Sequence, residues 1–201
     1  MHIFTEGIKI TEVENHCLVY MVGNPEQWLQ NVINDKIIAR RTALINAWQP
    51  KLFADPEVTD LPADEHALVE LIISRPDYKT RTQKDEESDS LRIRKTHNLN
   101  AFNGDIEEGV ARIPSDASIT LFEGGIDLDD EDWNCLHAYV RNMNDWVIGA
   151  LLGKIHQGKQ TLIKEWYPKL LGDPEVFTIP ATEEGLITMI VARDDYKQRN
   201  N

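Results

Sequence analysis

The stretch WQPKLFADPEV at residues 48–58 decides the fold, because it returns almost unchanged as WYPKLLGDPEV at residues 166–176. The match extends in both directions at a constant offset of 118 residues and needs no gap. Residues 1–83 and 119–201 share 30 identical positions in this alignment. The chain therefore contains one folding pattern written twice.

The repeat predicts three parts: a first repeat at residues 1–83, a linker with a small β-element at 84–118, and a second repeat at 119–201. Each copy is long enough to fold, although small units bury only a modest share of their surface. Packing of the copies against each other would add stability. We therefore expect a tandem duplication in a pseudo-two-fold arrangement.

A long amphipathic helix is predicted in each copy. Apolar residues shared by the copies recur at spacings of three and four from Trp28 onward, as on one face of a helix. Asn24 offers an N-cap to this helix in the first copy. Pro50 is expected to kink or restart it, and the pair Asp55-Pro56 to end it. The second copy has the same signals 118 residues later.

The shorter elements complete an α-dominated α+β fold class. The first ten residues of each copy alternate around a glycine, which indicates an extended segment or small hairpin. A capping-box pattern at Thr11–Glu14 predicts a short helix that buries Cys17 and Leu18. The sequence Pro62-Ala63-Asp64-Glu65 is typical of the start of another helix, which carries Leu68, Leu71 and Ile72. A strand is the alternative because of the β-branched content. In the middle segment, acidic residues 84–90 indicate a linker and residues 91–94 alternate like an edge strand.

The charge balance limits the classes of partner. The chain has 21 Lys and Arg against 34 Asp and Glu, a formal net charge of −13. Direct binding of nucleic acid is disfavoured, because its affinity depends on cations that neutralise phosphates. No apolar run approaches the ~20 residues that span a bilayer, and the N-terminal sequence does not resemble a secretory signal. We expect protein partners and no membrane.

The two cysteines, Cys17 and Cys135, occupy equivalent positions of the repeat. We expect two reduced, packed thiols, because free cysteine behaves as a small hydrophobic residue. A disulfide between them is the alternative that the sequence leaves open.

No catalytic, cofactor or metal site is predicted. The acidic run at residues 127–132 fails as a calcium loop, which needs glycine at its sixth position and glutamate at its twelfth; those positions hold Asp132 and Ala138. Carboxylates at the start of a helix explain the run through the helix dipole. The six histidines show no zinc-ligand spacing, and no nucleophile or phosphate-loop motif is present.

Polar residues retained in both copies allow two interpretations: a twinned ligand site, or a network of capping and salt bridges inside each copy, which we favour. Among the aromatic residues, the paired tryptophans are expected to be core anchors between the two halves, and the paired tyrosines to pack their rings. These predicted interface and core anchors are Trp28, Trp48, Trp146, Trp166, Tyr78 and Tyr196.

The repeated string resembles small uncharacterised proteins encoded by tailed bacteriophages. The resemblance rests on four segments of the first copy and on their looser counterparts in the second, which has Asp194 in place of Pro76. It covers about 55 residues of each copy and implies a phage context, as a virion component or assembly partner. The four segments are W-x-P-K-L from Trp48, D-P-x-V from Asp55, P-A-x-E from Pro62 and R-P-D-Y-K-x-R from Arg75.

The function that these observations favour is that of a non-enzymatic interaction or structural protein, phage-encoded and part of a larger assembly or a homo-oligomer. One alternative is an acidic inhibitor of a host protein that mimics the charge of DNA, which would concentrate carboxylates into one stripe. The other is a small-molecule-binding protein or carboxylate-based enzyme, which requires a concave pocket lined by titratable groups with perturbed pKa values.

Overall fold

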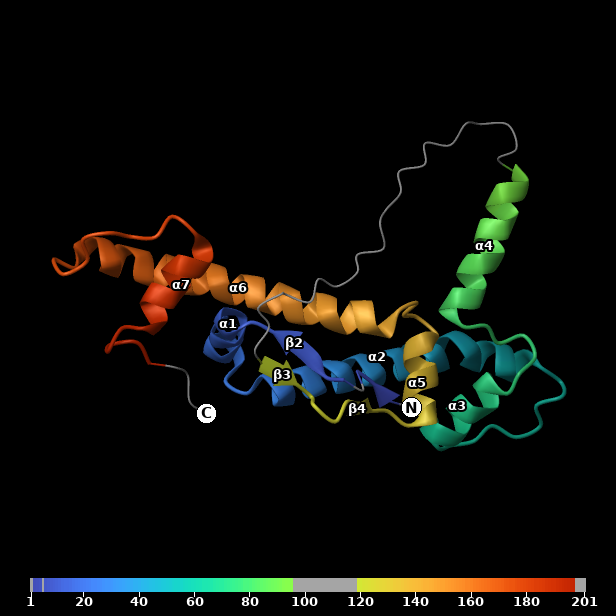
Figure 1. Cartoon of the computed structure of the whole chain (residues 1–201). Helices are drawn as coiled ribbons and strands as arrows, with labels where there is room; N and C mark the ends of the chain where they lie inside the picture. Colours follow the sequence, from blue (N-terminus) through green and yellow to red (C-terminus); the bar gives the residue numbers. More distant parts are fainter. Residues whose placement is uncertain (1, 5, 96–118, 198–201) are drawn as a thin grey trace. The chain divides into compact units, whose positions relative to one another are not determined.

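The computed structural model describes residues 2–4, 6–95 and 119–197 (Figure 1). The described residues form two compact units, and each unit draws on both sequence copies. Unit 1 comprises residues 2–3, 32–95 and 126–146, and unit 2 comprises residues 4, 6–31, 119–125 and 147–197. The compact units therefore do not coincide with the sequence repeats at 1–83 and 119–201.

Helices dominate the described residues, which confirms the predicted α-dominated α+β class. Two of the three pairs of corresponding helices match in length: the long helices have 30 residues each and the helices that follow them 9 each, whereas the short N-terminal helices have 11 and 8. The helices are α1 (Glu12–Val22), α2 (Pro25–Ala54), α3 (Glu65–Ile73), α4 (Arg81–Lys95), α5 (Asp130–His137), α6 (Met143–Gly172) and α7 (Glu183–Val191).

Two antiparallel strand pairs join the N-terminal stretches of the two copies. In unit 1, β1 (His2–Ile3) pairs with β4 (Ile126–Asp127), and in unit 2, β2 (Ile8–Ile10) pairs with β3 (Ile119–Leu121). The turn before β2 requires Gly7, which has a φ of 72° and whose added Cβ would lie 2.8 Å from the Leu121 carbonyl oxygen. A small β-element is also predicted within residues 84–118, and residues 96–118 of this segment lie outside the described residues.

The predicted helix starts are confirmed. Thr11 and Glu14 form a reciprocal capping box at α1, with Thr11 N–H donating to Glu14 Oε2 at 2.9 Å. The Gln27 N–H donates to Asn24 Oδ1 at 3.0 Å at the start of α2. Each bond satisfies an amide that has no partner inside the helix. In the second copy, Asp129 and Asn142 accept the corresponding bonds at α5 and α6.

The long helices continue through Pro50 and Pro168, so of the expected kink or restart the restart does not occur. Both prolines lie in the last turns, and α2 and α6 end at Ala54 and Gly172. A proline there removes one backbone hydrogen bond out of a 30-residue helix, and the buried residues on both sides of it hold the last turn against the core. The expected end before the Asp-Pro pair is confirmed.

Residues 84–95 belong to helix α4, so the expected linker at 84–90 and edge strand at 91–94 are wrong. The helix starts with a second capping box, in which the Thr80 N–H donates to Gln83 Oε1 at 2.9 Å and the Gln83 N–H to Thr80 Oγ1 at 3.4 Å. Arg81 is the first residue of the helix, and its Nε lies 2.9 Å from Oδ2 of Asp85, one turn later. Capping and i,i+4 ion pairs together stabilise a polar helix.

Each unit has a core made from both copies. In unit 1, Trp48 of α2 and Ile72 of α3 pack in one cluster with Cys135 of α5. In unit 2, Cys17 of α1 packs with Trp166 of α6 and Ile190 of α7. The short N-terminal helix of one copy thus packs against the long helix of the other copy, in both units.

Candidate functional site

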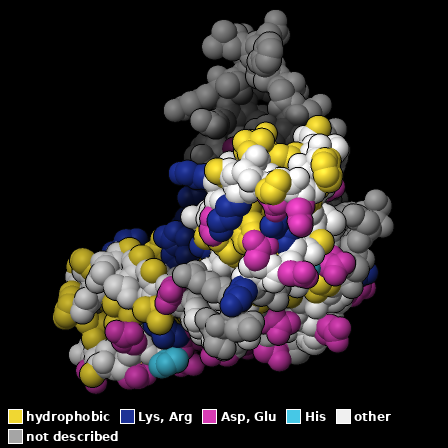
Figure 2. Space-filling model, turned by 90° about the vertical axis from the view of Figure 1, so that its left-hand side faces the viewer, with side chains coloured by type: hydrophobic (Ala, Val, Ile, Leu, Met, Phe, Trp, Pro, Cys, Tyr) yellow, Lys and Arg dark blue, Asp and Glu magenta, His cyan; other side chains and the backbone are white. Residues whose placement is uncertain are grey.

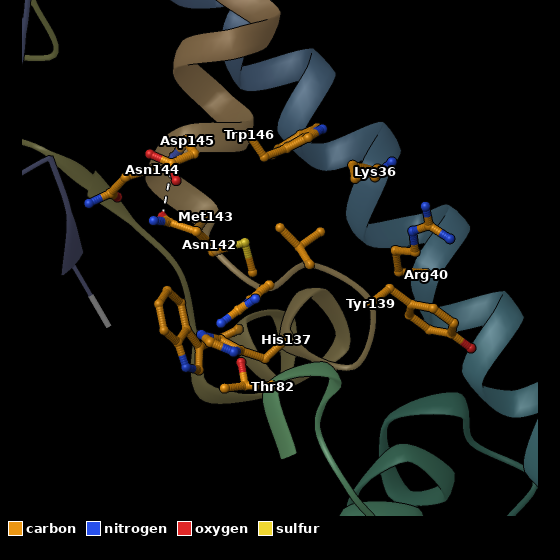
Figure 3. Close-up of a pocket in the computed structure, with 13 residues that line it drawn as sticks. Lys36, Arg40, Thr82, His137, Tyr139, Asn142, Met143, Asn144, Asp145 and Trp146 are labelled. Atoms are coloured by element: carbon orange, nitrogen blue, oxygen red, sulfur yellow. Dashed lines mark hydrogen bonds between the residues drawn. The ribbon is translucent and has the colours of Figure 1, made fainter. Parts of the chain in front are cut away.

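Unit 1 contains a cavity of about 800 Å³, lined by α2, the first residues of α4, α5 and the start of α6 (Figure 3). The residues that line it combine basic, aromatic and amide side chains. These basic, aromatic and polar residues are Lys36, Arg40, Thr82, Trp133, His137, Tyr139, Arg141, Asn142, Asn144, Asp145 and Trp146.

Local structure brings these side chains together. Lys36 and Arg40 lie one helical turn apart on α2, and both line the cavity. Helix α5 ends at His137, and a short connection leads to Asn142, whose Oδ1 accepts a hydrogen bond from the Asp145 N–H at 3.2 Å (Figure 3). This cap starts α6 directly after the connection and places Trp146 in its first turn.

The cations of the cavity lie over aromatic rings. Lys36 Nζ is 5.4 Å from the centroid of the Trp146 ring, and Arg40 Cζ is 4.9 Å from that of Tyr139. Within the described part of the chain, Lys36, Arg40 and Arg141 form no ion pair with a carboxylate. Three cations therefore face one acidic side chain, Asp145, among the described residues that line the cavity.

Three side chains that line the cavity have perturbed pKa values: Lys36, His137 and Tyr139. Burial, together with the charge of Arg40, lowers the pKa of Lys36. Burial also lowers the pKa of His137 and raises that of Tyr139. Burial thus disfavours the charged form of each of these groups, and a bound anion would relieve the repulsion between Lys36 and Arg40.

Unit 2 lacks most of this chemistry at the corresponding positions. It keeps the lysine–tryptophan pair, with Lys154 Nζ 5.9 Å from the Trp28 ring centroid. Gly158 replaces Arg40, and an added Cβ there would lie 2.5 Å from the Cys17 carbonyl oxygen. Helix α1 therefore approaches α6 too closely for any side chain at that position. The other replacements in unit 2 are Asn15 for Trp133, Val19 for His137, Met21 for Tyr139 and Gly23 for Arg141.

The six predicted anchors do not converge on one site. Trp48 and Trp166 are buried, with 6% and 5% of their surface exposed, whereas Trp28 and Trp146 are half-buried. Tyr78 packs beside Trp48 at a centroid distance of 6.1 Å in unit 1, and Tyr196 lies 6.0 Å from Trp166 in unit 2. Burial raises the pKa of Tyr78 to about 12. Trp146 is the predicted anchor that lines the cavity.

Several of the polar residues retained in both copies have local structural contacts. In unit 1, Arg75 pairs with Asp55 and Asp77, which ties the end of α3 to the turn after α2. The carboxylate of Asp55 also accepts the Glu57 N–H at 2.9 Å, and these two hydrogen bonds lower its pKa. Unit 2 repeats the arrangement with Arg193, Asp173, Asp195 and Glu175.

A charged cluster in unit 1 was missed by sequence reasoning. Arg41 of α2 lies 2.9 Å from Glu131 Oε1 and 2.8 Å from Asp132 Oδ1 of α5, and His66 of α3 also contacts Glu131. The helix dipole alone does not account for the acidic run at residues 127–132, because Glu131 and Asp132 also contact side chains of the first copy. No repeated pattern indicates this, because unit 2 has Lys159, Val13, Glu14 and Glu184 at these positions.

The contact between His66 and Glu131 should make stability depend on pH. The hydrogen bond with Glu131, followed by the charge of Glu131, raises the pKa of His66 in the folded state. The stabilisation is therefore fully present below the ordinary histidine pKa of about 6.5 and is lost as pH rises through the raised value. We expect the gap in unfolding free energy between the wild type and His66→Gln to shrink from about pH 5.5 to about pH 8.5, measured by urea titration. A gap that is constant or widens with pH would contradict this assignment.

The described residues offer no further site of a familiar kind. No three His, Cys, Asp or Glu side chains among them gather as metal ligands. Cys17 and Cys135 are free and buried, and burial raises the pKa of each thiol to about 11. None of the described helices combines the length and apolar character that crossing a bilayer demands. Comparisons with protein-family models, curated proteins and solved structures found no match for this chain.

Proposed function

We propose that this chain is a non-enzymatic interaction or structural protein, encoded by a phage and acting as a virion or assembly component. One observation carries the proposal: an exposed apolar side chain at the same position of both long helices. Phe53 near the end of α2 is 70% exposed, and Leu171 near the end of α6 is 63% exposed. The sequence resemblance to phage proteins supports the same context.

A single exposed apolar residue is ordinary on a protein surface. Here the exposure occurs at corresponding positions, next to Leu52 and Leu170, which are fully buried. In unit 2, Leu171 also has an exposed aromatic neighbour one turn earlier, Tyr167. Exposed apolar groups of this kind indicate surfaces that bind other proteins.

The exposed residues Phe53 and Leu171 mark equivalent ends of the two long helices, and two such ends on one chain suit a partner that presents the same surface many times. Because both ends belong to one chain, binding of one end raises the effective concentration of the other, so two weak contacts give strong binding overall. A lattice built from many copies of one protein, such as a virion, is a partner of this kind. The proposed location is therefore the virion, or the host cytoplasm during assembly.

The duplicated architecture belongs to the same proposal. The two copies would derive from a tandem duplication of a single-copy protein in a pseudo-two-fold arrangement. Matching helix lengths, matching caps and the repeated arginine–aspartate contacts support this origin. The exchange of N-terminal helices between copies corresponds to a domain-swapped dimer fused into one chain.

The test is co-fractionation with phage particles from the cell that carries the gene, together with light scattering of the purified 23.0 kDa chain. We expect the chain to migrate with the particles and the double variant Phe53→Ser, Leu171→Ser to be released. Ile38→Ser is the matched control, because Ile38 is 58% exposed but has His156 at the corresponding position. A stable monomer that associates with no particle and no partner would refute the proposal.

The alternatives differ in their support. On the face shown in Figure 2, Asp and Glu side chains are interspersed with Lys, Arg and hydrophobic groups, so this face has no single acidic stripe of the kind that a DNA mimic needs. The described residues that line the cavity include one carboxylate, Asp145, which gives little support to a carboxylate-based enzyme. Small-molecule binding is the second candidate, because the cavity combines concave shape with perturbed pKa values.

A further inference from the structure

We propose that the cavity of unit 1 binds a small anionic ligand with an aromatic ring, of the nucleoside monophosphate class. This inference goes beyond the interaction function and does not depend on it. It rests on the positive charge of the cavity, on its aromatic walls and on the absence of the same side chains from the corresponding positions of unit 2.

The charge of the cavity opposes that of the chain. The chain carries a formal charge of −13, yet Lys36, Arg40 and Arg141 line the cavity with one carboxylate, Asp145. The Nε of Arg40 is buried and has no hydrogen-bond partner. Unpaired cations that are partly removed from water favour a ligand that brings negative charge, and arginine suits phosphate oxygens in particular.

The aromatic side chains provide surfaces for a ring. Trp133 lies beside His137, with ring centroids 4.4 Å apart, and Trp146 and Tyr139 also line the cavity. Stacking of a nucleobase on an aromatic side chain contributes about 1–3 kcal/mol. Burial lowers the pKa of His137, so its imidazole is neutral at pH 7 and can accept or donate a hydrogen bond.

Size and polarity fit the same ligand. A volume of about 800 Å³ falls in the range of small-molecule sites. Figure 3 shows Asn142, Asn144 and Thr82 among the residues that surround the space. Their amide and hydroxyl groups can bind the sugar hydroxyls or the edge of the base.

The comparison of the two units separates a structural role from a binding role. Both units keep a lysine over a tryptophan, Lys36 with Trp146 and Lys154 with Trp28, so this pair is explained by packing. At five other positions unit 2 has Gly, Asn, Val or Met, so packing that both units share does not explain the side chains that unit 1 has there. Unit 1 fills them with two arginines, a tryptophan, a histidine and a tyrosine, which are the side chains that a phosphate and a ring would contact.

The experiment is a calorimetric titration of the full chain with the four common nucleoside monophosphates, and with inorganic phosphate and adenosine as half-ligands. We expect at least one monophosphate to bind at least about tenfold more tightly than either half-ligand, with affinity that falls as salt is added. Equal affinity for phosphate alone would overturn the aromatic part of the proposal. The absence of binding by every monophosphate at millimolar concentration would overturn it entirely.

Variants locate the binding in the cavity. Arg141→Ser removes an exposed cation and should weaken binding by about tenfold or more, the loss of one charge-assisted contact. Trp133→Asn, which introduces the residue of unit 2, should remove the advantage of a monophosphate over phosphate. Lys154→Met in unit 2 is the matched control and should leave affinity unchanged. If Lys154→Met weakens binding as much as Arg141→Ser does, the cavity is not the site; circular dichroism verifies that each variant is folded.

Discussion

Replacement of Trp48 by alanine is expected to lower the unfolding free energy by about 3–5 kcal/mol, because truncating a buried tryptophan removes a large apolar surface and leaves a cavity. Trp48 is 6% exposed and packs in the core of unit 1. Its ring also lies 6.1 Å from that of Tyr78 and 4.4 Å from Lys51 Nζ. Trp166→Ala should cause a similar loss in unit 2, where Lys169 Nζ is 4.1 Å from the ring.

Urea unfolding followed by circular dichroism measures both losses. Trp28→Ala is the control, because this ring is half-buried and should cost clearly less. The comparison separates the effect of burial from that of the lysine, because each of the three rings lies beneath a lysine. Equal losses for Trp28 and Trp48 would show that the burial described here is wrong.

The second large effect is expected for Arg41→Met, at about 2–4 kcal/mol. The change leaves the carboxylates of Glu131 and Asp132 without their shared cation, while the side chains stay only 12% and 24% exposed. Burial, followed by the charge of Asp129, already raises the pKa of Asp132 despite the presence of Arg41. Two partly buried anions without a cation should therefore destabilise the packing of α5 on α2.

Lys159→Met is the matched control, because Lys159 holds the corresponding position of unit 2. We expect it to cost less than about 1 kcal/mol, because Lys159 is half-buried but forms no ion pair with a carboxylate in the described part of the chain. The loss in Arg41→Met should also shrink as pH falls, because Asp132, whose pKa is raised, becomes protonated and part of the unpaired charge is removed. A loss of equal size in both variants, or one that is independent of pH, would contradict the role assigned to Arg41.

Elements that depend on local sequence could be predicted. The helix starts at Thr11, Asn24 and Asn142 follow from side chains that cap amides within three residues. Burial of Cys17 and Leu18 follows from the apolar spacing of α1. Helix α4 could also have been found, because Thr80 and Gln83 form a recognisable capping box; the polar composition hid it.

The exchange of helices between copies could not be predicted. Because the copies share much of their apolar pattern, periodicity alone allows α1 to bury Cys17 and Leu18 against the long helix of either copy. Sequence periodicity identifies the face that is buried and leaves its partner undefined. The alternation of residues 2–10 does not determine how the strands pair either. One difference between the copies does bear on the choice of partner, because α1 approaches α6 closely at Gly158 and α2 has Arg40 at that position.

The candidate site could not be predicted from residues that both copies retain, because most of its side chains occur in one copy only. Retained residues such as Arg75 and Asp55 turn out to hold each unit together. The cavity depends instead on a difference between the copies, Arg40 in one and Gly158 in the other. Replaced positions in an internal repeat are therefore as informative about function as retained ones.

The central claim is that each compact unit combines the N-terminal helix of one copy with the long helix of the other. Nuclear Overhauser spectra of the full chain test it most directly, since the chain has only 5 tyrosines. Tyr20 and Tyr196 lie with ring centroids 6.5 Å apart in unit 2, so we predict cross-peaks between their ring protons. Cross-peaks from Tyr20 to Tyr78, the equivalent residue of its own copy, would show that the helices are not exchanged.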